Sequence, residues 1–558
     1  MGGRVLHFLV AALAVGGLAA IGADRASPGA GAADAEGGIF RITINAASGI
    51  DSMDPALASS PPGWALLDTT CARLMAYPDK PPPAGFRLQP EVAADFPSIS
   101  SDRRSFTFRL RSGFRFSDGS PVRASAFARA INRMLAPEMR SPGLQYVRDI
   151  VGAGQVVAGK SSAASGVIAR GNTLVVRLTR PAPDFPSRTA STFFCAVPPT
   201  LPIDAEGRGE FPAAGPYYVV DYRRGERVVL RRNPYYGGER PHHVEGFDVD
   251  LRVASPQEVL RRVDRGEADW GHTLSGIYFD SALGLVEKYG INRPQGQLQL
   301  RPGLTLRLLA FNSARPLFRD NPRLRKAVNF ALDRRALVLV GGQHVSRASD
   351  QYLPPSLPGF RDADVYPLER PNLARAKELA QGSLRSAKAV LYVNSSPPPM
   401  AVAQLVKQQL AEIGLEVEVR GIPIHSATAA YFNKLATPGE PWDIAFGLWT
   451  PSYIDPYAYI NLLFDRRFVG ATNFARFSSS AYDRSLRQAA RLPQGVGRQS
   501  AYSTLDVQLA RDAAPIAVVD VLNEPTLVSR RVGCIVLRPA LDLTSVCLEL
   551  PGVTAPGR

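Results

Sequence analysis

Residues 388–419 constrain the fold most, because their pattern predicts two strands joined by one helix. Residues 388–394 (KAVLYVN) have the composition of a buried strand, and residues 415–419 (LEVEV) alternate apolar and charged side chains. Between them lies an apolar stripe at helical spacing, which Gly414 follows as a helix terminator: Val402, Leu405, Val406, Leu410 and Ile413. Such a unit pairs its strands in parallel through a right-handed crossover. The stretch therefore predicts an α/β lobe built on a parallel sheet.

The length and composition of the chain predict a globular protein of several domains. At 558 residues the chain exceeds what one hydrophobic core supports, and 45% of its residues are hydrophobic. Its formal net charge of +15 comes from basic residues scattered along the sequence. Because no basic block is present, the charge indicates a solvated basic surface, and we expect no nucleic-acid partner.

The amino terminus has the pattern of an export signal. Arg4 precedes the short apolar run 8–21, and Ala33-Asp34-Ala35 fits a small-residue cleavage site. We therefore assign residues 1–35 to a signal peptide and linker, with an uncleaved anchor as the alternative, since a membrane span needs about 20 apolar residues. No Cys lies near this segment, so we expect an exported protein on the periplasmic or extracellular face of the membrane that is not a lipoprotein.

Four cysteines in an exported chain predict disulfide bonds. Cys534 and Cys547 bracket a short segment that a hairpin could close, which leaves Cys71 and Cys195 as a long-range pair. The alternative is four unpaired, buried thiols.

Residues 89–135 form a recognisable unit of strands, a turn and a helix. Residues 106–110 and 114–116 alternate apolar and polar side chains, and Asp118-Gly119 is a strong turn signal. Apolar residues then recur at helical spacing from residue 127 to residue 135.

This unit resembles the signature of the extracellular solute-binding proteins of ABC importers, family 5, the oligopeptide-, dipeptide- and nickel-binding type. The residues that match the family pattern are Arg109, Gly113, Phe116, Asp118, Gly119 and Pro121. One departure is the absence of a capping box, because Arg123 and Ala126 stand where the family usually has a Thr cap and an acidic residue. Further stretches resemble the family in the same order along nearly the whole chain: residues 214–217, 233–236, 266–270, 309–312 and 321–332.

The resemblance implies an α/β, two-lobe, periplasmic-binding-protein-like fold of class II (cluster C type) with an extra subdomain in the first lobe. We expect the core of lobe I to consist of residues 36–50, 205–302 and 521–558. Residues 51–204 form the expected extra subdomain of lobe I, and residues 303–520 form lobe II. A chain that leaves a lobe and returns crosses at least twice, and we expect residues 306–312 and 516–521 to be the crossing segments. The resemblance also implies a monomer that captures a small solute, most simply a peptide or peptide-like compound, and delivers it to the membrane subunits of an ABC permease.

The candidate ligand wall is the end of the apolar strand predicted at residues 442–448. Trp449, Thr450, Ser452 and Tyr453 follow that strand, and aromatic and hydroxyl groups at the carboxyl edge of a sheet are typical of a binding site. The alternative is a core strand followed by a structured loop. Peptide-binding members of the family typically place an Asp at the position of Ser452, where it holds the peptide's amino group. Since a buried ammonium needs an anion, either another acid supplies it here or the ligand has no free amine.

The resemblance also places His272 at the cleft and Asn312 near the lobe crossing, as two further ligand contacts. The sequence contains no nucleophile elbow and no phosphate-binding loop, and its cysteines lack the spacing of metal ligands. We therefore expect no enzyme, no catalytic residue, no metal and no cofactor. The alternatives are an exported hydrolase and a sensory or chaperone-like interaction protein on the same fold.

Overall fold

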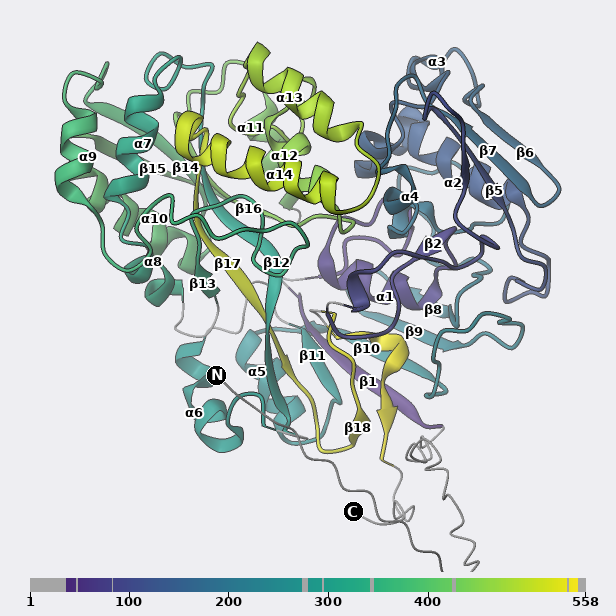
Figure 1. Ribbon diagram of the computed structural model, residues 1–558. Coiled ribbons are helices and arrows are strands. Elements are labelled where there is room, and N and C mark those ends of the chain that lie inside the picture. The colour runs from purple at the N-terminus through teal and green to yellow at the C-terminus, as the bar shows by residue number, and fades with distance from the viewer. Residues whose placement is uncertain are drawn as a thin grey trace, which may run out of the picture.

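The computed structural model describes residues 37–46, 49–82, 84–272, 279–293, 296–341, 346–423, 428–538 and 541–549. The predicted signal segment lies outside these residues. In the part of the chain that is described, two larger sheets are ordered β11-β1-β10-β9-β8 and β13-β17-β12-β16-β14-β15, and a four-stranded sheet is ordered β4-β5-β7-β6 (Figure 1). We call the first the lobe I sheet and the second the lobe II sheet.

The lobe I sheet is mixed. Strand β1 pairs in parallel with β10 and β11, whereas β9 pairs antiparallel with β10 and with β8. Helix α5 covers one face, and it begins at Ser255, whose side chain accepts a hydrogen bond from the Glu258 backbone N–H at 3.2 Å. The elements of this lobe are β1 (Ile39–Asn45), β8 (Tyr217–Arg223), β9 (Arg227–Arg232), β10 (Gly246–Val253), α5 (Pro256–Asp264), β11 (Trp270–His272) and α6 (Phe279–Tyr289).

Residues 51–204 contain the four-stranded sheet, drawn with α2 to α4 at the upper right of Figure 1, and a two-stranded sheet of β2 and β3, whereas α1 lies nearer the centre and packs against the lobe I sheet. The elements are α1 (Pro61–Thr70), β2 (Met75–Ala76), β3 (Gln89–Pro90), β4 (Ser98–Ile99), β5 (Ser105–Arg109), α2 (Ala124–Leu135), α3 (Ala153–Val157), β6 (Val167–Arg170), β7 (Thr173–Arg177) and α4 (Phe185–Arg188). Arg123 caps α2 without a side-chain hydrogen bond, as the missing capping box predicts. The strand predicted at residues 114–116 is wrong, since the chain makes only an isolated bridge at Arg115 before turning through Gly119, whose φ is +83°.

The lobe II sheet contains the predicted strand–helix–strand unit. Strands β14 and β15 pair in parallel from Lys388 with Glu416 onward, and α10 connects them. Helices α7 to α10 cover one face, and α12 to α14 cover the other (Figure 1). The elements are α7 (Pro322–Ala331), α8 (Arg334–Gly341), β13 (Ser346–Ala348), α9 (Leu373–Ala380), β14 (Lys388–Asn394), α10 (Pro397–Ala411), β15 (Glu416–Ile422), α11 (Thr428–Ala436), β16 (Ile444–Trp449), α12 (Tyr457–Phe464), α13 (Ser480–Ala490) and α14 (Val496–Gln508).

Two long antiparallel strands, β12 (Leu298–Phe311) and β17 (Ile516–Leu527), run from the lobe II sheet to the edge of the lobe I sheet (Figure 1). Their pairing is irregular between Pro302 and Leu306, and just beyond β17 Val528 bridges to Trp270 of β11.

Both predicted disulfides are present. The bond between Cys71 and Cys195 ties the end of α1 to the segment after α4, and the bond between Cys534 and Cys547 joins β18 (Val532–Cys534) to β19 (Cys547–Leu548). No helix within the described ranges is long and apolar enough to cross a membrane.

Candidate functional site

The segment after β16 lies beside the crossing strands. Trp449 ends β16 and pairs with Leu306 of β12. The Thr450 hydroxyl lies 2.9 Å from the Thr305 hydroxyl, in the irregular part of β12. The segment that follows β16 therefore lies beside the stretch of β12 where the regular strand pairing is interrupted.

The Trp449 ring lies inside lobe II. Only 7% of the residue is exposed, its Nε1 donates a hydrogen bond to the Ala458 carbonyl at 3.0 Å, and the ring packs edge-on against Phe474 at 6.0 Å. The ring is thus held on several sides by this chain's own residues, as the alternative of a core strand followed by a structured loop expects.

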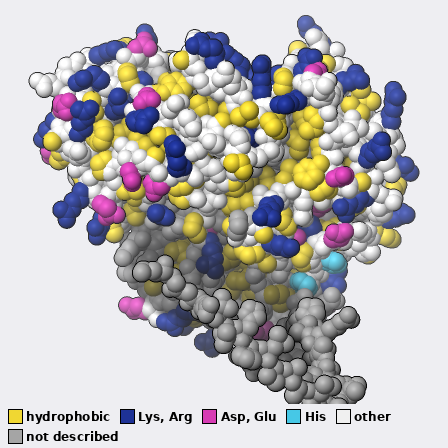
Figure 2. Space-filling view, in the orientation of Figure 1, with side chains coloured by type: hydrophobic (Ala, Val, Ile, Leu, Met, Phe, Trp, Pro, Cys, Tyr) yellow, Lys and Arg dark blue, Asp and Glu magenta, His cyan; other side chains and the backbone are white. Residues whose placement is uncertain are grey.

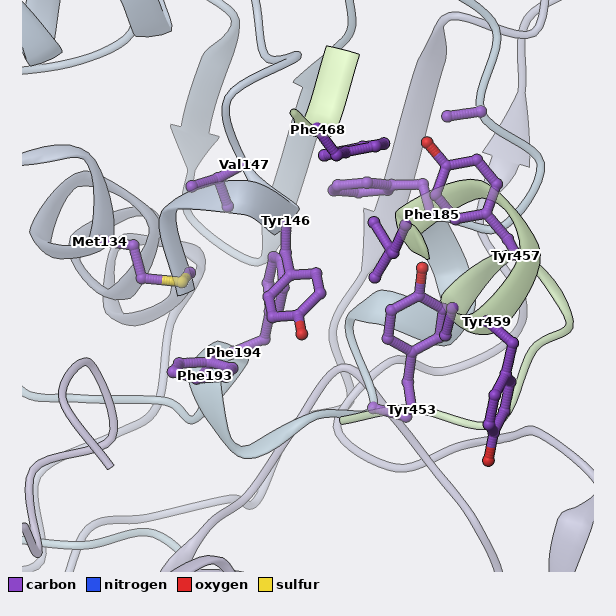
Figure 3. Packing of buried hydrophobic residues seen from close by; sticks show 14 of the residues in the cluster. Met134, Tyr146, Val147, Phe185, Phe193, Phe194, Tyr453, Tyr457, Tyr459 and Phe468 are labelled. Atoms are coloured by element: carbon purple, nitrogen blue, oxygen red, sulfur yellow. The ribbon is translucent and has the colours of Figure 1, made fainter. Parts of the chain in front are cut away.

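Tyr453 lies between lobe II and the 51–204 region. It is 3% exposed, its hydroxyl donates to Asp184 Oδ2 at 3.2 Å, and its ring packs edge-on against Tyr146 at 5.7 Å (Figure 3). Burial, followed by the negative charge of Asp184, raises the Tyr453 pKa well above its usual value, so the hydroxyl remains a donor. We call the surface where residues 51–204 meet residues 450–500 the seam.

Further hydrogen bonds cross the seam. The Tyr77 hydroxyl donates to the Ile454 carbonyl at 3.2 Å and accepts from the Ile454 N–H at 3.1 Å. Arg180 donates to the Tyr457 hydroxyl at 3.2 Å. These contacts join segments that are hundreds of residues apart in sequence, so they exist only while the lobes are together.

The charged side chains at the seam are paired with one another. Arg188 binds Asp184 at 2.7 Å and Asp149 at 2.9 Å, and Arg498 binds Asp455 at 2.8 Å. Burial alone would raise the Asp184 pKa, but the adjacent Arg188 more than offsets this, and the pKa lies below its usual value. Asp184 is therefore ionised, and all three of these acids are bound by guanidinium groups.

Ser452 presents a neutral hydroxyl at the same place. Its Oγ is buried and makes no hydrogen bond of ordinary geometry within the described part of the chain. Burial raises the pKa of the neighbouring Tyr146 to about 12, and a weaker interaction with Ser452 offsets part of that rise. Both groups are uncharged hydrogen-bonding partners at neutral pH.

The other two predicted contacts are not brought to this segment. Asn312 follows the far end of β12, away from the irregular stretch, and its Nδ2 donates to the Trp442 carbonyl at 3.0 Å. Asn312 thus follows the lobe II end of β12, beyond the irregular stretch, and its contact with a solute stays a prediction. His272 ends β11 in lobe I, where it pairs with Ile44, and burial lowers its pKa to about 4, so it is neutral at pH 7.

Sequence reasoning did not find the seam residues of the 51–204 region: Tyr77, Tyr146, Asp149, Asp184 and Arg188. The only local signal is the spacing of Asp184 and Arg188, which places them on one face of a helix. Their meeting with Tyr453 has no signal in the sequence.

The surface has hollows elsewhere and no concentrated basic patch on the face in view. One hollow of about 480 Å³ lies between α13 and α14, and one of about 240 Å³ lies between α5 and α6; neither borders the segment from Thr450 to Tyr453. Figure 2 shows Lys and Arg side chains scattered over the surface, as their spacing in the sequence predicts.

Two lobes joined by a pair of crossing strands, with a polar and aromatic seam between them, define a binding protein of the two-lobe α/β class. The chain matches the family described as bacterial extracellular solute-binding proteins, family 5, over residues 87–469. The chain belongs to this family, and the resemblance found in its sequence is confirmed. It is an extracellular solute-binding protein.

Relatives and solved structures agree with this assignment. The oligopeptide-binding protein OppA of Bacillus subtilis is 24% identical over 410 residues, which are 70% of this chain and 72% of that protein. The probable D,D-dipeptide-binding periplasmic protein DdpA of Escherichia coli is 22% identical over 514 residues, 90% of this chain and 92% of that protein. The structure of clavulanic acid biosynthesis oligopeptide binding protein 2 matches with a TM-score of 0.82 and 22% identity over 92% of this chain and 96% of that chain. The Escherichia coli murein tripeptide binding protein MppA matches with a TM-score of 0.72 and 22% identity over 93% and 99%. The predicted fold class is confirmed.

Proposed function

We propose that this chain captures a peptide or peptide-like solute between its lobes and delivers it to the membrane subunits of an ABC permease. The observation that carries the proposal is the seam, where Tyr453, in the loop after β16 of lobe II, donates a hydrogen bond to Asp184, which precedes α4 of the 51–204 region. The names of the relatives supply the solute class and their periplasmic location. We further propose that the mature protein is an exported monomer without a lipid anchor, and that it has neither a catalytic activity nor a nucleic-acid partner.

The proposed division of the chain follows the sheets. Residues 36–50, 205–302 and 521–558 form the core of lobe I, residues 51–204 the extra subdomain, and residues 303–520 lobe II. Support comes from β12 and β17, whose pairing with each other is interrupted at residues 303–305, and from the bridge of Val528, just beyond β17, to Trp270 of the lobe I sheet. A hinge at that stretch needs only a few backbone angles to change, because the strands on either side keep their hydrogen bonds.

Within the seam, we propose that Thr450, Ser452 and Tyr453 contact the solute and that Trp449 supports them from the core. His272 lies at the carboxyl edge of the lobe I sheet and faces the solute from the other side, whereas Asn312 contributes indirectly by holding the start of β16. Closure is favourable only when the solute adds contacts that the open form lacks.

The test begins with mass spectrometry of the solute that co-purifies with the protein from its native host. The protein is then unfolded, freed of solute and refolded, and the same compound is returned while small-angle X-ray scattering reports the radius of gyration. We expect stoichiometric binding and a smaller radius in the bound form. Turnover of added peptides, or a protein that retains and binds no solute, contradicts the proposal.

A matched pair of variants separates closure from folding. Tyr453→Phe removes the hydroxyl that reaches Asp184 across the seam, whereas Tyr482→Phe removes a hydroxyl that donates to the Gln508 carbonyl at 3.2 Å inside lobe II. We expect the first change to weaken solute binding about fivefold, because one seam hydrogen bond contributes about 1 kcal/mol, and the second to leave binding unchanged. Equal effects of the two changes would show that the seam has no special part in binding.

A further inference from the structure

Three carboxylates of the seam, those of Asp149, Asp184 and Asp455, are each paired with arginines of the same chain. Asp184 and Asp455 are the acids that act electrostatically on Tyr453, and each is bound by a buried guanidinium: Asp184 by Arg188 and Asp455 by Arg498. The second acid held by Arg188 is Asp149, which also pairs with Arg180 at 3.3 Å. Three acids and three arginines balance, so this set of side chains has no carboxylate to spare.

The groups that remain for a solute are neutral. Ser452 has a buried hydroxyl without a well-formed hydrogen bond, and Thr450 has a half-buried hydroxyl beside the hinge. The Tyr146 hydroxyl lies toward Ser452. Hydroxyl groups donate to and accept from amide and carbonyl groups, but they do not neutralise a charge.

An ammonium group enclosed at the seam would lose its hydration, and none of these three acids would be available as its counter-ion. Removing an ion from water without pairing it costs far more than leaving a hydroxyl or amide in the same place. Breaking one of the existing pairs would not help, because it would leave a buried guanidinium uncompensated instead.

We propose that the solute held at the seam has no free ammonium group there, and that it is an N-acylated or otherwise amine-blocked peptide-like compound. This inference rests on the proposed function and specifies its substrate class. The seam excludes solutes with a free amino terminus, because Ser452 offers only a hydrogen bond where such a terminus would need a negative charge.

Within the described ranges, Glu524 of the crossing strands forms no ion pair with an arginine, and this carboxylate provides the opposing hypothesis. Glu524 of β17 lies over Gly303, where an added Cβ would be 3.2 Å from Glu524 Oε1. Burial raises its pKa to about 7, so it is only partly ionised at neutral pH. If this acid received a solute's amino group, the selection would be reversed.

The experiment compares tri-alanine with N-acetyl-tri-alanine by titration calorimetry at pH 7, using the full mature chain and variants shown to be folded by circular dichroism. We expect the acetylated peptide to bind the unaltered protein at least tenfold more tightly. Ser452→Asp adds an anion and should reverse the order, whereas the similar-sized, neutral Ser452→Asn should not.

Tighter binding of free tri-alanine to the unaltered protein, or equal binding of the two peptides, overturns the inference while the capture of peptides stands. If Glu524→Gln no longer binds free tri-alanine, Glu524 is the acid that receives the amino group of the peptide. If the unaltered protein and all variants bind neither peptide, peptide capture itself fails, and the inference fails with it.

Discussion

Replacing Trp449 by alanine distinguishes a core residue from a ligand wall. The side chain is 7% exposed, its ring packs against Phe474, and its Nε1 donates to the Ala458 carbonyl at 3.0 Å. Removing a buried Trp ring typically costs about 3–5 kcal/mol in lost burial and cavity formation. The lost indole hydrogen bond contributes about 1 kcal/mol of that range. We therefore expect Trp449→Ala to lower the free energy of unfolding of lobe II by about 4 kcal/mol.

The assay is urea unfolding followed by far-ultraviolet circular dichroism, beside calorimetry with the co-purified solute. Trp449→Phe is the matched control, because it keeps an aromatic ring in the core and removes the indole N–H; we expect it to cost about half as much. Solute affinity of the folded fraction should change little in either variant. A Trp449→Ala protein that unfolds normally but has lost its solute affinity more than tenfold would show that the ring faces the ligand, and would refute this reasoning.

Three further perturbations test the buried groups that hold the fold. Removing the bond between Cys71 and Cys195, which are 124 residues apart, should lower the unfolding free energy by about 5 kcal/mol in the chain-entropy model, and thiol titration of denatured, unreduced protein should find no free thiol. Burial raises the pKa of Asp506 to about 7, so as the pH rises the unfolded state loses this proton before the folded state does. The free energy of unfolding should therefore decrease as the pH rises from about 4 to about 7, by up to about 1.4 kcal/mol per pH unit. Urea unfolding of Asp506→Asn should lack this decrease. Arg498→Met leaves the Asp455 carboxylate buried without its partner and should lower the melting temperature, at a cost of about 3–5 kcal/mol, most of which Asp455→Asn in the same chain should recover.

The sequence by itself determined the local elements and the family. Residues 388–419 fold as a parallel pair of strands around a helix because their apolar periods of 2 and 3.6 fit only that arrangement. The short spacing of Cys534 and Cys547 indicated a hairpin, and the predicted export of the chain indicated that these two cysteines would form a disulfide. Helix and strand periods and the spacing of nearby cysteines depend on residues close together in the chain, so they can be read directly from a single sequence.

The tertiary structure decided which side chains reach the seam. Strand β16 is apolar on both faces, so its sequence does not tell whether Trp449 turns toward the core or toward a ligand, and only the structure shows that its indole N–H donates to the Ala458 carbonyl of α12. The Tyr453 hydroxyl donates a hydrogen bond to Asp184, which lies 269 residues earlier in the chain and forms an ion pair with Arg188. A contact between two lobes depends on the relative placement of whole sheets, and no local pattern of residues encodes that placement. The ion pairs themselves lie within one region each, Asp184 with Arg188 in residues 51–204 and Asp455 with Arg498 in lobe II, and contact between the regions adds the hydrogen bond from Tyr453 to Asp184.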